Sequence, residues 1–267
     1  MFFKTMGRQI VTIILFAFSL AGCESIQIDQ TMTVTPIIPE AAPTLPTGTL
    51  IPINTPQPPS SASSLSAYAF PDAIDPAKNY LFYLHGKILE DQGIPAVSPD
   101  YGEYEYEAIL KKLSGFGFVV ISEQRPKNAD VMDYAQKITG QVTTLLKAGV
   151  PAKSITVVGA SKGAALAIYV SHFLENKEVN YVIMAICHPD NVAGFKQDQI
   201  FLYGNILSIY DYKDELSGSC KDLFAFSEGK GIARHEEIVL NIGTGHGILY
   251  KPLAEWISPV IQWAGKQ

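Results

Sequence analysis

Residues 155–165 read Ile155-Thr156-Val157-Val158-Gly159-Ala160-Ser161-Lys162-Gly163-Ala164-Ala165. The first part is apolar and β-branched, which is typical of a buried strand, and the second is small and apolar, as at the start of a buried helix. Gly159 and Gly163 flank Ser161, and a sharp strand-to-helix turn favours glycine where a Cβ would not fit. The pattern therefore predicts a turn that lifts Ser161 out of a sheet and directs the first N–H groups of the helix towards the same point. The alternative interpretation is a glycine-rich turn with a structural serine.

Strands and helices alternate along the chain on both sides of this turn. Apolar runs predict further strands, and amphipathic or small-residue runs predict the intervening helices. This alternation predicts a parallel sheet with right-handed crossovers. The predicted strands span 78–84, 118–122, 154–158, 181–186, 206–210 and 236–242, and the predicted helices span 103–113, 131–146, 164–173 and 252–264.

The Gly-x-Ser-x-Gly turn between a strand and a helix, with His85-Gly86 upstream and Asp and His downstream, resembles the α/β-hydrolase family. The resemblance covers roughly residues 80–265 and implies an α/β fold: a mostly parallel sheet with helices on both faces. Only residues 67–79 precede the first clear strand, so the antiparallel strands that usually open this family are expected to be missing or reduced.

The resemblance also implies where a cap domain would lie. This family often inserts one between the strands that here end near Cys187 and begin near Ile206. About eighteen residues separate these two positions, which is too few for a large cap.

In this family the nucleophile, the acid and the base follow one another in the order Ser, Asp, His. By resemblance, Ser161 is the nucleophile and His246, in a glycine-rich loop after the last strand, is the base. Asp214 follows the strand 206–210 at the family's usual offset for the acid. Asp190 is the alternative acid, because some members carry it one strand earlier, and Asp214 is favoured. Asp211 is interpreted as a turn residue.

The resemblance further implies an oxyanion hole of backbone N–H groups. One donor is Gly86 or Lys87, after the first strand, and the other is Lys162, beside the nucleophile. We expect His85 to brace its loop and the Lys162 side chain to be solvated, although it could also form a rim charge. Residues 88–102 are predicted to form a long loop that either lines the site or extends into solvent.

The first 22 residues are predicted to be a signal peptide. Lys4 and Arg8 precede an apolar stretch, Ile10 to Phe18, that is too short to span a bilayer comfortably. Leu20-Ala21-Gly22-Cys23 follows and looks like the bacterial lipoprotein signal, in which the cysteine is acylated. An ordinary secretory signal with a chance cysteine is the alternative.

Residues 23–66 are predicted to be a disordered tether, and residues 67–267 the hydrolase domain. Eight of the seventeen prolines fall between Pro36 and Pro59, among Thr, Ser and Ala, so this stretch lacks the apolar surface needed to fold. The chain has a net charge of −6, which argues against nucleic-acid binding and against attraction to an anionic membrane surface.

Two further cysteines could pair. In the family the strands that precede Cys187 and Cys220 are neighbours, which would place both thiols at one edge of the sheet. Secretion would allow a disulfide to persist, and the alternative is two unpaired cysteines, with Cys187 buried as a small apolar residue.

Together these features predict a serine hydrolase, carboxylesterase-like, that is tethered by lipid at Cys23 and faces outward in a bacterial cell envelope. The expected substrate is a small or polymer-borne acyl group, and the resemblance implies no metal and no organic cofactor. Contact with the membrane is expected through the N-terminal lipid only. The alternatives are a thioesterase, amidase or peptidase with the same triad, and a non-catalytic envelope-binding lipoprotein on a hydrolase fold.

Overall fold

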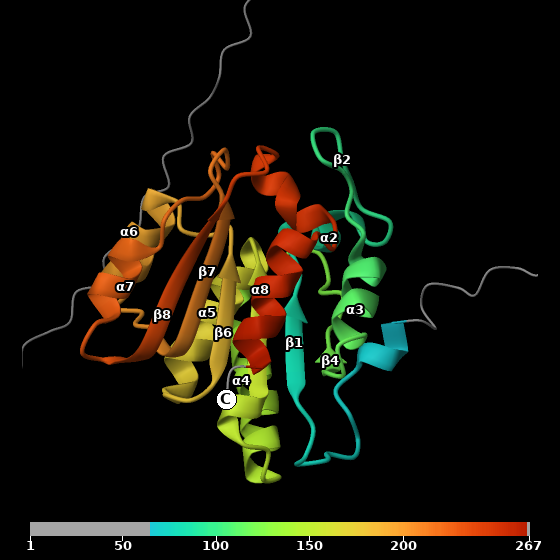
Figure 1. Ribbon diagram of the computed structural model, residues 1–267, viewed down its shortest axis with the longest axis vertical. Coiled ribbons are helices and arrows are strands. Elements are labelled where there is room, and N and C mark those ends of the chain that lie inside the picture. Colours follow the sequence, from blue (N-terminus) through green and yellow to red (C-terminus); the bar gives the residue numbers. More distant parts are fainter. Residues whose placement is uncertain (1–64, 266–267) are drawn as a thin grey trace, which may run out of the picture. The chain divides into compact units, whose positions relative to one another are not determined.

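Six strands form one sheet in which every neighbouring pair runs parallel (Figure 1). The structure is a computed structural model, and it describes residues 65–265. Across the sheet the strands are β4 (Val119–Ile121), β1 (Tyr80–Leu84), β5 (Ile155–Ala160), β6 (Asn180–Met184), β7 (Tyr203–Asp211) and β8 (Gly231–Leu240).

Helices cover both faces of this sheet, which confirms the predicted fold class (Figure 1). Side chains of β1 show why its sequence is apolar without interruption, because Phe82 and Leu84 enter one core while Leu81 and Tyr83 enter the other. One core is closed by α4 (Val131–Lys147), α5 (Lys162–Leu174), α6 (Pro189–Gln197) and α7 (Lys221–Ser227). The other is closed by α3 (Tyr106–Ser114), the 3₁₀ helix η3 (Gly245–Tyr250) and α8 (Ala254–Gly265).

The described chain has no strand between Leu65 and β1, as expected from the short segment there. A 3₁₀ turn, η1 (Ser66–Tyr68), lies beside the edge strand β4 instead, and the Ser122 N–H donates to the Tyr68 carbonyl at 2.8 Å. Between β6 and β7 the chain forms only α6, which packs on the core through Val192 and Phe195, so this interval holds no cap.

Two predictions about individual segments are wrong. Residues 88–102 do not form an irregular loop, because they contain α2 (Lys87–Gln92) and most of a small hairpin of β2 (Val97–Ser98) and β3 (Gly102–Glu103). The last strand begins earlier than predicted, so His235 lies within β8, stacked on Phe224, rather than before it. The first residues of β8 include polar, half-exposed side chains, so the sequence offered no clear sign of where this edge strand starts.

A 3₁₀ turn, η2 (Ala152–Ser154), leads into β5.

The predicted signal peptide (1–22), Cys23 and the tether up to residue 64 lie outside the described residues. Among residues 65–265, no helix combines the length and the apolar character needed to cross a membrane.

The start of α5 lies so close to the strands that glycine is required there. A Cβ on Gly163 would lie 1.8 Å from the Leu84 carbonyl oxygen, and a Cβ on Gly159 would lie 2.2 Å from the Gly163 carbonyl oxygen. Both neighbours are backbone atoms, which cannot rotate away. These two close approaches position the residue between them, Ser161, at the carboxyl edge of the sheet.

Gly163→Ala should therefore lower the free energy of unfolding by about 3 kcal/mol or more, because the new Cβ would push α5 away from β1. The matched control is Gly194→Ala in α6, where a Cβ would meet no atom within 4 Å. That change should leave stability unchanged or raise it by up to ~1 kcal/mol. Urea denaturation of both variants measures the difference, and equal midpoints would contradict the close approach.

Candidate active site

Ser161 occupies a strained turn between β5 and α5. Its backbone has φ 52° and ψ −118°, in a region that residues with a side chain rarely adopt. Its N–H donates to the Met184 carbonyl at 2.9 Å, which ties the turn to the end of β6. The conformation directs the Ser161 hydroxyl away from the sheet and towards His246.

A chain of two hydrogen bonds joins Ser161, His246 and Asp214. The Ser161 Oγ lies 2.9 Å from His246 Nε2, and His246 Nδ1 lies 2.9 Å from Asp214 Oδ2. A carboxylate can only accept, so Nδ1 carries the proton of a neutral His246 and Nε2 is left as the acceptor for the serine hydroxyl. His246 is thus held in the tautomer that a general base for Ser161 requires.

The structure brings Asp214 to His246 and leaves Asp190 elsewhere. The Asp214 side chain is fully buried, and its Oδ1 accepts the Leu216 N–H at 3.0 Å. Asp190 lies in the first turn of α6 with its side chain 94% exposed, and its carboxylate is 3.5 Å from His188. Asp190 therefore lacks the contact with His246 that an acid of this kind requires.

Asp211, interpreted from the sequence as a turn residue, holds the loop that carries His246. Its Oδ2 accepts N–H groups from Ile242 and Gly243 at 2.9 Å, and its Oδ1 accepts from Gly245 at 3.1 Å and from Lys213 at 3.0 Å. Burial raises the pKa of Asp211, but these backbone donors outweigh it, so the pKa is lowered overall from its ordinary 3.8. Sequence offered no signal for this role, because three of the four donors come from a loop about thirty residues further along.

On the opposite side of Ser161, the N-termini of two helices meet. Lys162 is the first residue of α5 and Lys87 is the first residue of α2, and a helix leaves its first N–H groups without an internal acceptor. Gly86 lies against Ser161, since a Cβ on Gly86 would be 3.6 Å from the Ser161 Cβ. These are the three backbone groups that the sequence suggested for an oxyanion hole.

Lys87 is favoured over Gly86 as the donor, because it lies within α2 and its N–H belongs to the N-terminus of that helix. Burial raises the pKa of the nearby Tyr104 to about 12, and its hydrogen bond with Tyr83 lowers that pKa in part.

A small cavity of about 170 Å³ adjoins these groups. Aliphatic and aromatic side chains form most of its walls, and the side chains of Ser161 and His246 and the backbone of the two helix N-termini complete them. It is lined by Gly86, Lys87, Ile88, Tyr104, Ser161, His246, Leu249 and Tyr250.

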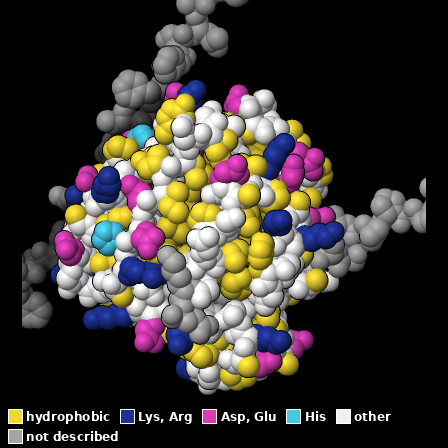
Figure 2. Space-filling view, in the orientation of Figure 1, with side chains coloured by type: hydrophobic (Ala, Val, Ile, Leu, Met, Phe, Trp, Pro, Cys, Tyr) yellow, Lys and Arg dark blue, Asp and Glu magenta, His cyan; other side chains and the backbone are white. Residues whose placement is uncertain are grey.

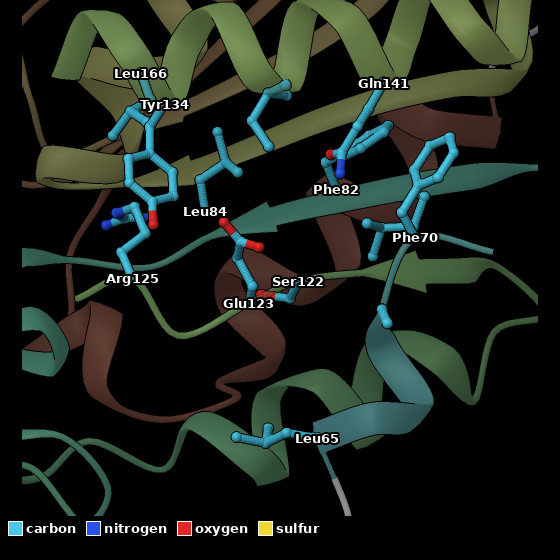
Figure 3. A pocket seen from close by; sticks show the side chains of 13 residues that line it. Leu65, Phe70, Phe82, Leu84, Ser122, Glu123, Arg125, Tyr134, Gln141 and Leu166 are labelled. Carbon is cyan, nitrogen blue, oxygen red and sulfur yellow. The ribbon is translucent and has the colours of Figure 1, made fainter. Parts of the chain in front are cut away.

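A separate cavity of about 270 Å³ lies under α4, lined by side chains that include Phe70, Phe82, Tyr134 and Gln141 (Figure 3). It contains no member of the Ser161–His246–Asp214 chain. The smaller cavity is therefore the candidate active site, since it holds the reactive groups.

Two expectations about side chains near the site have different outcomes. His85 does brace its loop, because its Nδ1 lies 2.8 Å from the Gly86 carbonyl oxygen and its Nε2 accepts the Arg125 N–H at 2.9 Å. Lys162 is not solvated, which corrects the prediction. Its Nζ lies 2.5 Å from Glu90 Oε2 and 2.7 Å from the Ala129 carbonyl oxygen, and only 18% of its side chain is exposed. The sequence could not reveal a partner 72 positions away.

Cys187 and Cys220 form a disulfide, with their Cα atoms 5.1 Å apart. The bond joins the segment after β6 to the residue that precedes α7. The loop that carries Asp214 lies between β7 and Cys220, so the disulfide closes one end of this loop.

Charged groups are dispersed over the face of the molecule shown in Figure 2, where neither basic nor acidic side chains gather into a large patch. Among residues 65–265, no group of three or more His, Cys, Asp or Glu side chains is placed to hold a metal ion.

Comparisons with known proteins give only a distant likeness. No model of a known family matches the sequence, and no curated protein matches it. Similar solved structures include SOBER1 of Arabidopsis thaliana (12% identity, TM-score 0.45, covering 71% of this chain and 100% of that chain). A carboxylesterase of Bacillus cereus has 14% identity and a TM-score of 0.47, and the match covers 72% of this chain and 90% of that chain. A hyperthermophilic esterase of Pyrobaculum calidifontis has 19% identity and a TM-score of 0.46, and the match covers 73% of this chain and 77% of that chain. Because every one of these scores is below 0.5, the case for a function rests on the site.

Asp211→Asn should destabilise the fold by about 2 kcal/mol at neutral pH, because the new NH₂ group would face donors that now meet a carboxylate oxygen. The pH dependence has a defined sign, since the folded-state pKa lies below the unfolded value of 3.8. As the pH falls below 3.8 the unfolded chain takes up a proton first, so the advantage of wild type should shrink and vanish below the folded pKa.

Urea denaturation across this pH range measures the effect. The control is Asp190→Asn, whose exposed carboxylate should leave stability unchanged at every pH. A wild-type advantage over Asp211→Asn that persists undiminished in acid would contradict this role for Asp211.

Proposed function

We propose that this protein is a serine hydrolase of the α/β-hydrolase type, which transfers an acyl group from a carboxylic ester to water through an acyl-Ser161 intermediate. The observation that carries the proposal is the hydrogen-bonded chain from Ser161 Oγ through His246 to Asp214, with both contacts at 2.9 Å. The strained turn at Ser161 supports it, since strain of this kind concentrates at functional sites.

In the proposed reaction, His246 Nε2 takes the proton of Ser161 as Oγ attacks the ester carbonyl carbon. The carbonyl oxygen becomes an oxyanion, which accepts hydrogen bonds from the N–H groups of Lys87 and Lys162. Collapse returns the proton from His246 to the leaving alcohol and leaves the acyl group on Ser161. Water then attacks the acyl carbon with His246 again as base, which releases the acid and restores the serine. Asp214 stabilises the imidazolium in both halves.

The site favours a short acyl group. The cavity of about 170 Å³ is smaller than most pockets for drug-sized ligands, and Tyr104, Leu249 and Tyr250 form its walls. With no cap between β6 and β7, a substrate whose short acyl group is borne on a larger alcohol or polymer could still reach Ser161. A panel of nitrophenyl esters, acyl thioesters and peptide amides separates the esterase from its thioesterase, amidase and peptidase alternatives.

We further propose that the protein is anchored by lipid on Cys23, faces outward in a bacterial cell envelope and touches the membrane only through that lipid. The lipoprotein-like sequence around Cys23 supports this, and the Cys187–Cys220 disulfide suits an oxidising compartment. Two or more acyl chains on one cysteine give stable attachment, at roughly 0.8 kcal/mol per buried CH₂.

Ser161→Ala should abolish labelling by a fluorophosphonate probe and lower kcat for a nitrophenyl ester by about 10⁶-fold. His246→Ala should cost nearly as much, and Asp214→Asn about 10⁴-fold, because the wrong tautomer of His246 would then be favoured. Asp190→Asn is the control, and its rate should match wild type. A wild-type protein that neither reacts with the probe nor turns over any ester would instead favour the non-catalytic alternative.

Cys23→Ser should leave the signal peptide unprocessed or release the protein from the membrane fraction, since no acyl chain can be attached. Fractionation of cells that express either form, with detergent extraction and intact mass of the product, makes the comparison. Ser19→Ala, in the same segment, is the control and should remain membrane-bound. Retention of a processed Cys23→Ser protein in the membrane would refute lipidation.

A further inference from the structure

A cluster of three charged side chains, two of them buried, adjoins the candidate active site through Lys162. Glu90 comes from α2, Arg125 from the segment after β4, and Lys162 from the first position of α5. Glu90 accepts from both cations at once, from Arg125 Nε at 2.7 Å and from Lys162 Nζ at 2.5 Å. The side chains of Glu90 and Arg125 are almost fully buried.

Arg125 extends the cluster to the segment that precedes Lys87. Its Nη2 donates to the His85 carbonyl oxygen, and its backbone N–H donates to His85 Nε2 at 2.9 Å. Burial lowers the pKa of His85 to about 3, with a further lowering by Arg125, so the ring stays neutral. It then donates from Nδ1 to the Gly86 carbonyl oxygen, because Nε2 is already an acceptor. Arg125 therefore holds this segment twice, through its guanidinium at the His85 carbonyl and through its backbone N–H at the His85 ring.

The contacts join the two helices whose first N–H groups meet at Ser161. Glu90 lies one turn into α2, which begins at Lys87, and its partner Lys162 begins α5. The Lys162–Glu90 ion pair therefore links the two predicted oxyanion donors through side chains. A shift of either helix would lengthen the distance between Lys162 Nζ and the Glu90 carboxylate.

The cluster also carries a surplus of positive charge, since it holds two cations and one carboxylate and His85 is neutral. The nearby Glu123 does not balance this charge, because its carboxylate pairs with Lys137 at the surface. Removing three ions from water costs several kcal/mol for each, and a buried ion pair is weak evidence for stability. Lys162, one of the two cations, begins the helix whose N-terminus faces Ser161, so the surplus charge belongs to the frame of the site.

We propose that Glu90 is a positioning residue for the oxyanion hole. Together with Arg125 and Lys162 it fixes the separation of the Lys87 and Lys162 N–H groups and holds a net positive charge behind them. This inference rests on the proposed hydrolase function. It assigns a role to three side chains that touch neither the nucleophile nor its base.

Glu90→Gln keeps the shape of the side chain but loses the ion pairs. We expect kcat to fall by about 10–100-fold with KM nearly unchanged, because the displaced donors act on the transition state rather than on the bound ester. Lys162→Met keeps the backbone N–H and removes the ammonium, and it should lower kcat by a similar factor.

Three measurements separate positioning from simple loss of folded protein. Active sites are counted by fluorophosphonate labelling, and kcat is expressed per labelled site, so that an unfolded fraction does not contribute. Inhibition by a phenylboronic acid, which forms a tetrahedral anion on Ser161, should weaken in each variant by the same factor as kcat/KM. In the double variant Glu90→Gln/Lys162→Met, the fold-loss in kcat should be smaller than the product of the two single losses, because both substitutions remove the same Glu90–Lys162 ion pair.

The control is Lys137→Met, which removes the exposed Lys137–Glu123 pair and should leave kcat unchanged. Unchanged kcat per labelled site in Glu90→Gln and Lys162→Met would overturn the inference, as would boronate inhibition that does not follow kcat/KM. If Glu90→Gln does not fold, Lys162→Met alone decides the test. The Lys162 side chain is partly exposed, so its replacement should disturb folding less. A wild type without probe labelling and turnover contradicts the proposed function itself, so the two failures are distinct.

Discussion

The close packing of α5 on the ends of β1 and β5 is the constraint on which the site depends. The Leu84 carbonyl occupies the place that a side chain at residue 163 would need. The Gly163 carbonyl likewise occupies the place that a side chain at residue 159 would need. With both flanks held this tightly, Ser161 must turn in a single residue and adopts a positive φ. Its hydroxyl and the Lys162 N–H therefore reach the same small space, and the remaining groups are arranged around that point.

Three buried carboxylates support this arrangement in different ways. Asp214 accepts a hydrogen bond from His246. Asp211 accepts hydrogen bonds from backbone N–H groups of the loop that carries His246. Glu90, on the other side of Ser161, accepts only from cations. Asp214 accepts from an imidazole and one backbone amide, Asp211 from backbone amides alone, and Glu90 from side-chain cations alone. This difference separates the residue proposed for chemistry from those that hold the frame.

Sequence reasoning succeeded where the signal is local. The strand-to-helix turn, the parallel sheet and its helices follow from periodicity and from glycine spacing. The family's chain order, applied by resemblance, identified Ser161, Asp214 and His246, three residues that do come together. It failed for Lys162, because the burial of this lysine depends on Glu90, which is 72 positions away. It also failed for α2, a helix of six residues whose Glu90 is paired with Arg125, 35 positions further along the chain. Asp211 looked like any turn residue, since its acceptors are saturated by amides that no side-chain pattern reveals.

The energetics explain why the disulfide lies where it does. The strained backbone of Ser161 costs about 1–3 kcal/mol, and the buried charges add further cost, so the site itself opposes folding. The loop after β7 has little apolar burial to hold it, because Tyr212 and Leu216 are more than half exposed. A cross-link between residues 33 positions apart contributes about 3–4 kcal/mol in the chain-entropy model. Because it lies at the end of the loop that carries Asp214, the cross-link offsets part of the cost of the site and stiffens the segment that holds this acid.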